Sequence, residues 1–433
     1  MIIHGWGRYP RREAAVCLPL SFAQCADLQR GADSCLPRGM GRSYGDSSLA
    51  ARVIETRHLD HFLDFDAATG VLTCAAGATL DQIIKTFVPR GWFLPVTPGT
   101  RFVTVGGAIA SDVHGKNHHV DGCFGDHVVR LELLLGDGSR VHTSPTELPD
   151  LFRATCGGMG LTGIILTASI RLKAIGSSDI VETTLKQPNL ESVLEAFEQN
   201  AARTYSVAWI DCLARGRHLG RSLLMVGEHA TDGNRTLQGG KGLTVPFDMP
   251  PALLNRASVG AFNTLYYGKA IRSSSTRIAP LESFFYPLDG LYEWNRLYGR
   301  PGFLQYQFVI PREAGIVALR QVLERIAASG RGSFLAVLKV FGKANDHLLS
   351  FPCDGYTLAL DFKYEPAVLE LLEALDRLVL EHGGRLYLAK DARMSEATFK
   401  AGYPHWQAFQ EVRAKYHALG RFSSEQSKRL GLQ

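Results

Sequence analysis

The sequence of 433 residues lacks the patterns that mark several large classes of protein. No stretch approaches about 18 consecutive apolar residues, so no transmembrane helix is predicted. Residues 1–16 lack the apolar run of a signal peptide. The eight cysteines are scattered, with no CxxC pair and no Cys/His ligand spacing. These absences predict a reduced, intracellular protein with buried thiols and no metal site.

Several catalytic and binding motifs are also missing. There is no GxxxxGK[ST] and no GxSxG, which excludes the P-loop and the serine-hydrolase elbow. A net charge of +5 without a dense Lys/Arg array gives no support for nucleic-acid binding. Residues 158–163 match GxGxxG, but a helix is predicted before them and a strand after them. Because a dinucleotide-binding turn needs the reverse order, the Rossmann interpretation is rejected.

Glycine is what the first part of the chain has in abundance. Three glycine clusters lie at 38–48, 95–129 and 156–165, and the second also holds four histidines. Glycine lets the backbone approach a ligand closely and supplies positive φ where the path requires it. Three such clusters favour a large bound cofactor over ordinary loops. With 45% hydrophobic and 21% charged residues, the chain is of globular composition, and its length predicts two or three domains.

Hydrophobic periodicity predicts alternating short helices and strands before residue 175. Helices are expected at 21–30 and at 79–89, the second with a capping box between Thr79 and Gln82. A hairpin is expected at 128–143 and a strand at 164–173. After 181, strands alternate with helices that follow Pro311 and Pro366 and end near Gly330 and Gly383. The pattern predicts an α+β fold with an antiparallel sheet covered by helices.

Residues 212–277 differ in composition from their surroundings. Periodicity is weak there, and between Arg215 and Arg277 nine Lys/Arg stand against three Asp/Glu. Such a stretch is expected to be irregular and flexible, serving as a lid, as a surface for a partner or as a disordered loop.

The motifs RGMGRSYGDSS, HGKNHH within 95–129, GGMGLTGII and LAKDAR resemble those of one flavoprotein family. The sequence resembles decaprenylphosphoryl-β-D-ribose 2′-oxidases, members of the vanillyl-alcohol-oxidase class with a PCMH-type FAD-binding domain. The resemblance covers nearly the whole chain. It implies an FAD-binding domain at 1–175, a substrate domain at 176–384, and a C-terminal segment at 385–433 that completes the FAD domain.

The resemblance also implies which residues hold FAD. They lie in the first pyrophosphate loop, in the central glycine cluster and at two later positions. The first loop contributes Arg38, Gly39, Met40, Gly41, Arg42, Ser43, Tyr44, Gly45 and Asp46. The central cluster contributes Gly99, Thr104, Val105, Gly106, Gly107, Ser111, Asp112 and His114. Ile164 and Tyr387 are expected to pack on the cofactor. Relatives that attach FAD covalently have His at the position of Arg42, so non-covalent binding is expected.

The implied catalytic residues are Lys390, His114 and Lys116. A lysine near a flavin can stabilise negative charge on the reduced ring, or, if burial lowers its pKa, take the proton of the substrate hydroxyl. Both roles stay open at this point. The residues implied to contact substrate are Tyr44, Lys116, Trp209, Tyr286, Gln305, Gln307 and Lys339. Mycobacterial members carry a cysteine where Ala359 stands here.

The resemblance implies oxidation of the 2′-hydroxyl of a polyprenylphosphoryl pentose, with a short-chain dehydrogenase reducing the keto product. The alternative is an oxidase of a soluble sugar, polyol or aldonolactone, and a non-catalytic flavin-binding subunit is a third hypothesis. A lipid substrate would give 212–277 a role in peripheral membrane contact. The expected location is cytoplasmic or on the inner face of a bacterial plasma membrane, and a periplasm-facing position stays open.

Overall fold

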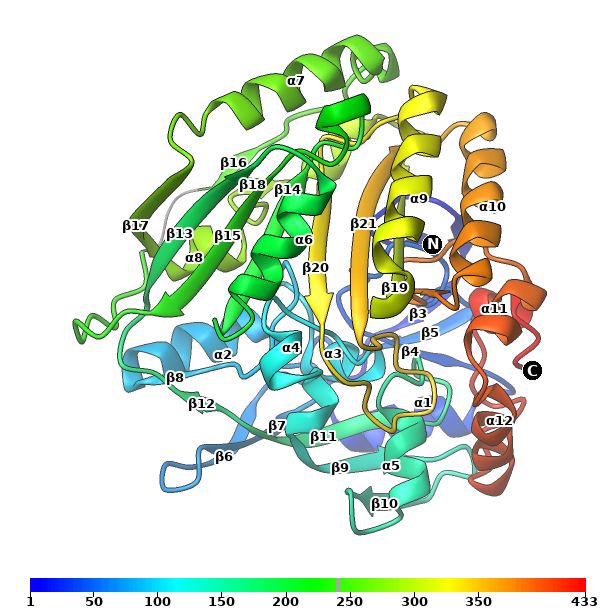
Figure 1. Cartoon of the computed structure of the whole chain (residues 1–433). Helices are drawn as coiled ribbons and strands as arrows, with labels where there is room; N and C mark the ends of the chain where they lie inside the picture. The colour runs from blue at the N-terminus through cyan, green and yellow to red at the C-terminus, as the bar shows by residue number, and fades with distance from the viewer. Residues whose placement is uncertain (239–241) are drawn as a thin grey trace.

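A computed structural model describes residues 1–238 and 242–433 and shows a body of small sheets beneath one large sheet (Figure 1). The mixture of helices with mostly antiparallel sheets confirms the predicted α+β class. Residues 239–241, which include one of the nine basic residues counted between Arg215 and Arg277, lie outside the described chain.

The N-terminal body holds two sheets. A three-stranded parallel sheet has the order β3(Ala15–Cys17)-β5(Arg52–Glu55)-β4(Leu36–Arg38). A five-stranded antiparallel sheet has the order β10(Arg140–Thr143)-β9(Val128–Leu134)-β11(Ile164–Arg171)-β7(Val71–Ala75)-β6(Phe62–Asp66). The helices of this body are α1(Phe22–Arg30), α2(Leu80–Phe87), α3(Val105–Ala110), α4(His118–Asp121) and α5(Pro149–Thr155). The predicted hairpin is β9–β10, and the capping box between Thr79 and Gln82 at the start of α2 is confirmed.

Three two-stranded sheets complete the strand inventory. They are β1(Ile2–His4)-β2(Arg11–Glu13), β8(Trp92–Phe93)-β12(Lys173–Ala174) and β16(Leu243–Thr244)-β18(Leu291–Tyr292). The segment 158–163 lies between α5 and β11. A helix before it and a strand after it confirm that the GxGxxG match is not a dinucleotide-binding turn.

The large sheet is eight-stranded and antiparallel throughout. Its order is β17(Ser274–Pro280)-β13(Asp179–Gln187)-β15(Ser222–His229)-β14(Tyr205–Ile210)-β20(Ala336–Phe341)-β21(Gly355–Lys363)-β19(Phe303–Pro311)-β22(Arg385–Leu386). Helices α6(Leu190–Gln199), α9(Gly315–Ser329) and α10(Pro366–Glu381) cover one face (Figure 1). Leu319 and Val322 of α9 are fully buried there, whereas Ile316 near the start of the helix is 42% exposed. The other face of the sheet, toward the N-terminal body, carries the polar residues of the site.

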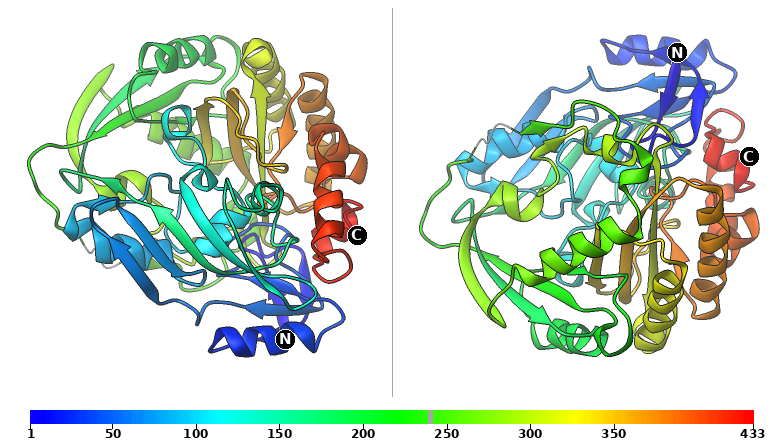
Figure 2. Two further views of the ribbon diagram at one scale, coloured as in Figure 1. Left: turned by 90° about the horizontal axis from the view of Figure 1, so that it is seen from below. Right: turned by 90° about the horizontal axis from the view of Figure 1, so that it is seen from above.

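The C-terminal segment returns to the N-terminal body through α11(Glu396–Gly402), α12(Trp406–Lys415) and α13(Glu425–Arg429). Figure 2 shows these helices beside the N-terminal part of the chain. Phe422 pairs with Cys35, and the Glu425 N–H donates to the Leu49 carbonyl. Residues 385–386 nevertheless form the edge strand of the large sheet, so the segment crosses both bodies. The domain boundaries at 175 and 384 stay predictions.

The prediction that residues 212–277 are irregular is wrong for most of the described residues in that range. It contains the buried strand β15, the helix α7(Arg256–Gly268) and the start of β17. Weak periodicity misled the prediction because β15 is buried on both faces and has no polar alternation. A short helix, α8(Leu281–Phe285), follows. In the described parts of the chain, no helix has both the length and the apolar character that a membrane span would require.

Candidate active site

A cavity of ≈ 370 Å³ lies between the two bodies. The N-terminal body contributes the loop 37–44 and the segment 98–114, and the large sheet contributes side chains from β19, β20 and β21. The C-terminal segment closes the wall with Tyr387 and Lys390. The volume is within the usual range of roughly 300–1,000 Å³ for small-molecule sites. Distant parts of the sequence therefore meet at one cavity.

The loop after β4 forms one wall through its backbone. Gly41 has φ of +61°, and a Cβ at that position would lie 2.3 Å from the Arg38 guanidinium. Arg38 itself is buried and bound to Glu55 Oε1 at 3.1 Å and to the Ser48 carbonyl at 2.8 Å. The charged Arg38 side chain therefore holds the loop in place. A side chain at position 41 would clash with it, so only glycine fits there.

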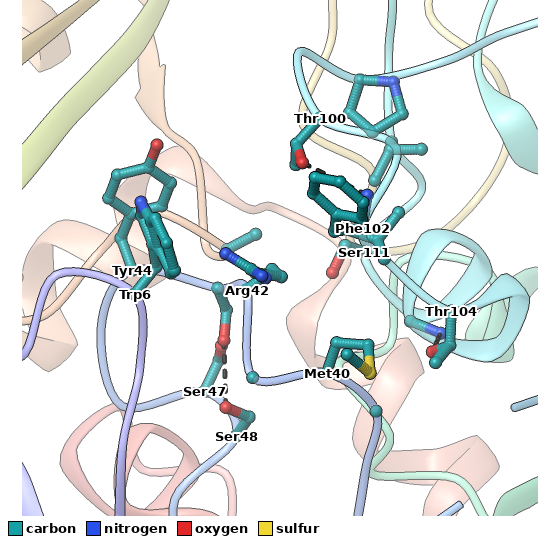
Figure 3. Close-up of a pocket in the computed structure, with 18 of the residues that line it drawn as sticks. Trp6, Met40, Arg42, Tyr44, Ser47, Ser48, Thr100, Phe102, Thr104 and Ser111 are labelled. Carbon is teal, nitrogen blue, oxygen red and sulfur yellow. Dashed lines mark hydrogen bonds between the residues drawn. The ribbon is translucent and has the colours of Figure 1, made fainter. Parts of the chain in front are cut away.

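Figure 3 shows Trp6, Arg42 and Tyr44 on one side of the cavity and Thr100, Phe102 and Ser111 on the other. The Arg42 guanidinium lies 4.1 Å from the centre of the Trp6 ring. Within the described chain it has no hydrogen bond and no ion pair, although burial lowers its pKa. A partly buried, unpaired cation beside an open glycine backbone fits an anionic group of the cofactor such as a diphosphate.

The register of the large sheet determines which side chains face the cavity on the opposite wall. Gln307 on β19 pairs with Ala359 on β21, which pairs with Val337 on β20, and all three line the cavity. Because side chains alternate along strands, Gln305 and Lys339 reach the same face two residues away. Sequence pattern alone does not place these three strands side by side.

Lys390 on this wall and the buried Asp361 affect each other's pKa. Burial lowers the pKa of Lys390 to about 7, against the opposing effect of Asp361. Burial raises the pKa of Asp361 to about 7, against a hydrogen bond from Gln305 Nε2 at 2.6 Å and the charge of Lys390. The Lys390 ammonium lies 3.9 Å from the centre of the Tyr44 ring. A lysine in this state can gain or lose a proton near neutral pH.

Two further cavity residues are affected by burial. The pKa of Lys339 is lowered to about 8 by burial. The pKa of His114 is held well below its usual range by burial and by the nearby Lys339, His118 and Lys390. His114 Nε2 lies 3.0 Å from Gln307 Nε2, and its ring packs 4.7 Å from that of Phe341. His114 is therefore neutral at physiological pH.

Most of the predicted site residues lie on the cavity wall. They are Arg38, Gly39, Met40, Gly41, Arg42, Ser43, Tyr44, Gly99, Thr104, Gly106, Gly107, Ser111, His114, Gln305, Gln307, Lys339, Tyr387 and Lys390. The structure brings them together from loops, strands and the C-terminal segment. Their individual roles toward cofactor and substrate stay predictions.

Lys116 does not line the cavity, and its catalytic and substrate-binding roles stay predictions. Its ammonium donates to the Phe284 carbonyl and lies 4.3 Å from the centre of the Phe284 ring. Burial lowers its pKa to about 7. The side chain points toward α8 and not toward the space occupied by His114.

Ile164 does not line the cavity either, and its packing on the cofactor stays a prediction. It is fully buried in a separate apolar cluster with Leu134 and Phe422, and its neighbour Ile165 lines the cavity. Successive residues of a strand face opposite sides, so a shift of one position reverses the assignment.

Asp112, Gly45, Asp46 and Val105 support the wall from behind. Asp112 accepts hydrogen bonds from Ser350 Oγ at 2.6 Å and from the Gly125 N–H at 2.9 Å, and its pKa is lowered to about 2 despite burial. A Cβ on Gly45 would lie 1.8 Å from the Asp391 carbonyl oxygen. Asp46 pairs with Arg429 at 2.7 Å, and Val105 is fully buried. These four residues do not line the cavity, and their direct contact with the cofactor stays a prediction.

Trp209 and Tyr286 are likewise buried away from the cavity. The Trp209 indole donates to the Phe334 carbonyl at 3.0 Å, and the Tyr286 hydroxyl lies 2.7 Å from Thr97 Oγ1. Their polar atoms already form hydrogen bonds within the protein, and their contacts with substrate stay predictions.

Sequence reasoning missed Asp361, Trp6 and Phe102. Asp361 had a signal, because a carboxylate inside the apolar strand LALDF needs a buried partner. Trp6 and Phe102 had none, since an isolated aromatic residue in a loop does not indicate what it faces.

Comparisons with known proteins agree with this geometry. A family model described as an FAD binding domain matches residues 14–144, and one described as D-arabinono-1,4-lactone oxidase matches residues 300–430. Decaprenylphosphoryl-beta-D-ribose oxidase of Mycolicibacterium smegmatis is 38% identical over 99% of this chain and 97% of its own length. A Streptomyces coelicolor protein, described only by its position in the mprA 5′ region, is 33% identical over 82% of this chain and 100% of its own.

A shorter likeness extends to a putative D-arabinono-1,4-lactone oxidase of Neurospora crassa, 28% identical over 31% of this chain and 24% of that protein. The near-complete coverage of the mycobacterial relative distinguishes it from this partial match. The glycine loop, the unpaired Arg42 and the buried lysine on the cavity wall fit the same assignment. The chain is an FAD-dependent oxidoreductase and belongs to the decaprenylphosphoryl-β-D-ribose oxidase family.

Proposed function

We propose that this enzyme oxidises the 2′-hydroxyl of a polyprenylphosphoryl ribose to the 2-keto sugar, the first half of an epimerisation to the arabinose donor used in cell-envelope glycan synthesis. The observation that carries the proposal is the 38% identity to the mycobacterial oxidase over 99% of the chain. The cavity supports it, because its wall combines cations with amide side chains that can bind a phosphorylated sugar.

FAD, when bound, supplies the hydride acceptor for the carbinol carbon. The chain's own task is to move the hydroxyl proton, and Lys390 is suited to take it because burial lowers its pKa to about 7. Gln305 holds the Asp361 carboxyl at 2.6 Å beside this lysine. Lys339, with a pKa lowered to about 8, is a cation available to the substrate phosphate.

The cofactor is proposed to be held without a covalent bond. Arg42 stands where covalent relatives have histidine, and its guanidinium lies against Trp6 as a cation for the cofactor's anionic part. Acid precipitation of the purified protein should release all of the flavin into the supernatant. A yellow, flavin-bearing pellet would show that another side chain forms a bond to FAD.

The test of the reaction is an anaerobic titration with a polyprenylphosphoryl ribose analogue. Loss of the oxidised flavin band, with a 2-keto product detected by mass spectrometry, is expected. The lactone-oxidase match over 300–430 makes a soluble aldonolactone the second candidate. Bleaching by lactones or polyols but not by the lipid-linked sugar would favour that candidate.

A short-chain dehydrogenase is the proposed partner reaction, because the 2-keto product must be reduced from the other face to complete epimerisation. Adding such an enzyme with NADH to the turnover mixture should convert the keto sugar into the arabinose epimer. Accumulation of the keto sugar under these conditions would show that this class of reductase does not use it.

Peripheral contact with an anionic membrane is proposed for the segment from β16 to β17. This segment carries exposed apolar side chains, including Leu243 at 75%, Leu265 at 76% and Ile271 at 93% exposed. Lys269 and Arg272 flank Ile271 and can meet lipid phosphates. β16 pairs with β18, whose residues Leu291 and Tyr292 line the cavity, so this surface continues to the site.

Sedimentation with vesicles that contain phosphatidylglycerol tests this surface. Leu265→Asp with Ile271→Asp should reduce binding strongly, since both side chains are exposed in the folded protein and lose their apolar contact with lipid. Leu63→Asp on β6, a residue 48% exposed on the N-terminal body, is the matched control. Equal binding of both variants would refute the membrane surface. A cytoplasmic enzyme that docks on the inner face of the plasma membrane is the location we infer.

A further inference from the structure

His114 is held by a directed chain of hydrogen bonds that begins at the backbone of β19. The Thr357 hydroxyl donates to the Phe308 carbonyl at 2.8 Å, and since a carbonyl only accepts, the hydroxyl proton is used there. The Gln307 amide lies 3.3 Å from that hydroxyl oxygen and 3.0 Å from His114 Nε2. All three residues are at least 95% buried, so their hydrogen bonds are largely shielded from solvent.

The direction of the chain fixes where the histidine proton lies. Because the Thr357 oxygen can only accept from Gln307, the amide nitrogen and not its oxygen faces both neighbours. An amide nitrogen has no lone pair to offer, so His114 Nε2 must accept. The imidazole proton is then on Nδ1, which has no hydrogen-bond partner among the described residues.

We propose that Thr357 and Gln307 are positioning residues that lock His114 as the neutral Nδ1–H tautomer and so remove it from proton abstraction. The lone pair on His114 Nε2 accepts an N–H of the Gln307 amide, and Nδ1 already carries a proton. The charged and titratable neighbours, Lys339, Lys390 and His118, all oppose protonation of the ring. The inference rests on the proposed function for its consequence, which is that Lys390 alone accepts the substrate proton.

The tautomer can be measured without any substrate. In the holoenzyme labelled with ¹⁵N-histidine, His114 should show a protonated Nδ1 and an unprotonated Nε2 signal from pH 6 to 8. The His114→Phe variant identifies the signals by their absence. An Nε2–H tautomer or an imidazolium in this range would overturn the proposal, whatever the substrate proves to be.

Two variants test the chain. Thr357→Val removes the hydroxyl and should let a second tautomer of His114 appear, with a loss of kcat/KM of about fivefold, as expected for one hydrogen bond. Thr357→Ser should keep both the single tautomer and the rate. Gln307→Glu presents only acceptors and should move the proton to Nε2. A single Nδ1–H tautomer in both Thr357→Val and Gln307→Glu would refute the directing role.

Discussion

Lys390 should give the reaction a pH dependence set by its lowered pKa. Its pKa is about 7, so about half of the molecules carry the neutral amine at pH 7 and roughly one tenth at pH 6. The neutral form accepts the proton. Activity should therefore be absent well below the pKa, rise as pH passes through about 7 and reach a plateau above 8.

The matched variants separate proton transfer from charge stabilisation. Lys390→Met should lower kcat by about 10²- to 10⁴-fold, the usual contribution of a positioned base. Lys390→Arg keeps a cation that does not deprotonate and should not restore the rate. Asp361→Asn removes the charge that raises the pKa of Lys390, so the rise in activity should move to lower pH.

Single-turnover flavin reduction at saturating substrate, measured from pH 5.5 to 9, is the assay. It isolates the chemical step from product release. An unchanged profile in Asp361→Asn, or full activity in Lys390→Arg, would refute the role of Lys390 as the proton acceptor. In the second outcome the lysine would act only as a fixed positive charge.

Three other predictions follow from contacts around the site. Arg429→Met removes the guanidinium that lies 2.7 Å from the carboxylates of both Asp46 and Asp391. The free energy of unfolding should fall by about 3–5 kcal/mol, because two buried carboxylates lose their shared cation. Urea titration monitored by flavin fluorescence checks this. Gly41→Ala should weaken FAD retention during gel filtration, because a Cβ would meet the Arg38 guanidinium at 2.3 Å. Ala359 lines the cavity where the resemblance places a thiol in mycobacterial members. Mass analysis after turnover with a thiol-capturing inhibitor should therefore show an adduct at another cysteine of the wild type, or none, whereas Ala359→Cys should gain an active-site adduct. An active-site adduct on the wild type would contradict this prediction.

The sequence by itself determined the features whose causes are local. Glycines such as those at 39 and 41 predicted close backbone approach to a large cofactor, because such approach requires glycine whatever the rest of the chain does. The motif around His114 contributed to the family resemblance, which implied that this cofactor is FAD. The capping box at Thr79 and the apolar periodicity of α9 and α10 likewise specify helices within a few residues.

Tertiary structure alone decided which of these residues share the site. Because side chains alternate along β11, Ile165 and not Ile164 lines the cavity. The turn after His114 places Lys116 against Phe284. The pairing of β19 with β21 placed Asp361 beside Gln305 and Thr357 within reach of Gln307. Neither sheet register nor side-chain direction at a loop is encoded by nearby residues, because both depend on contacts between segments far apart in the chain.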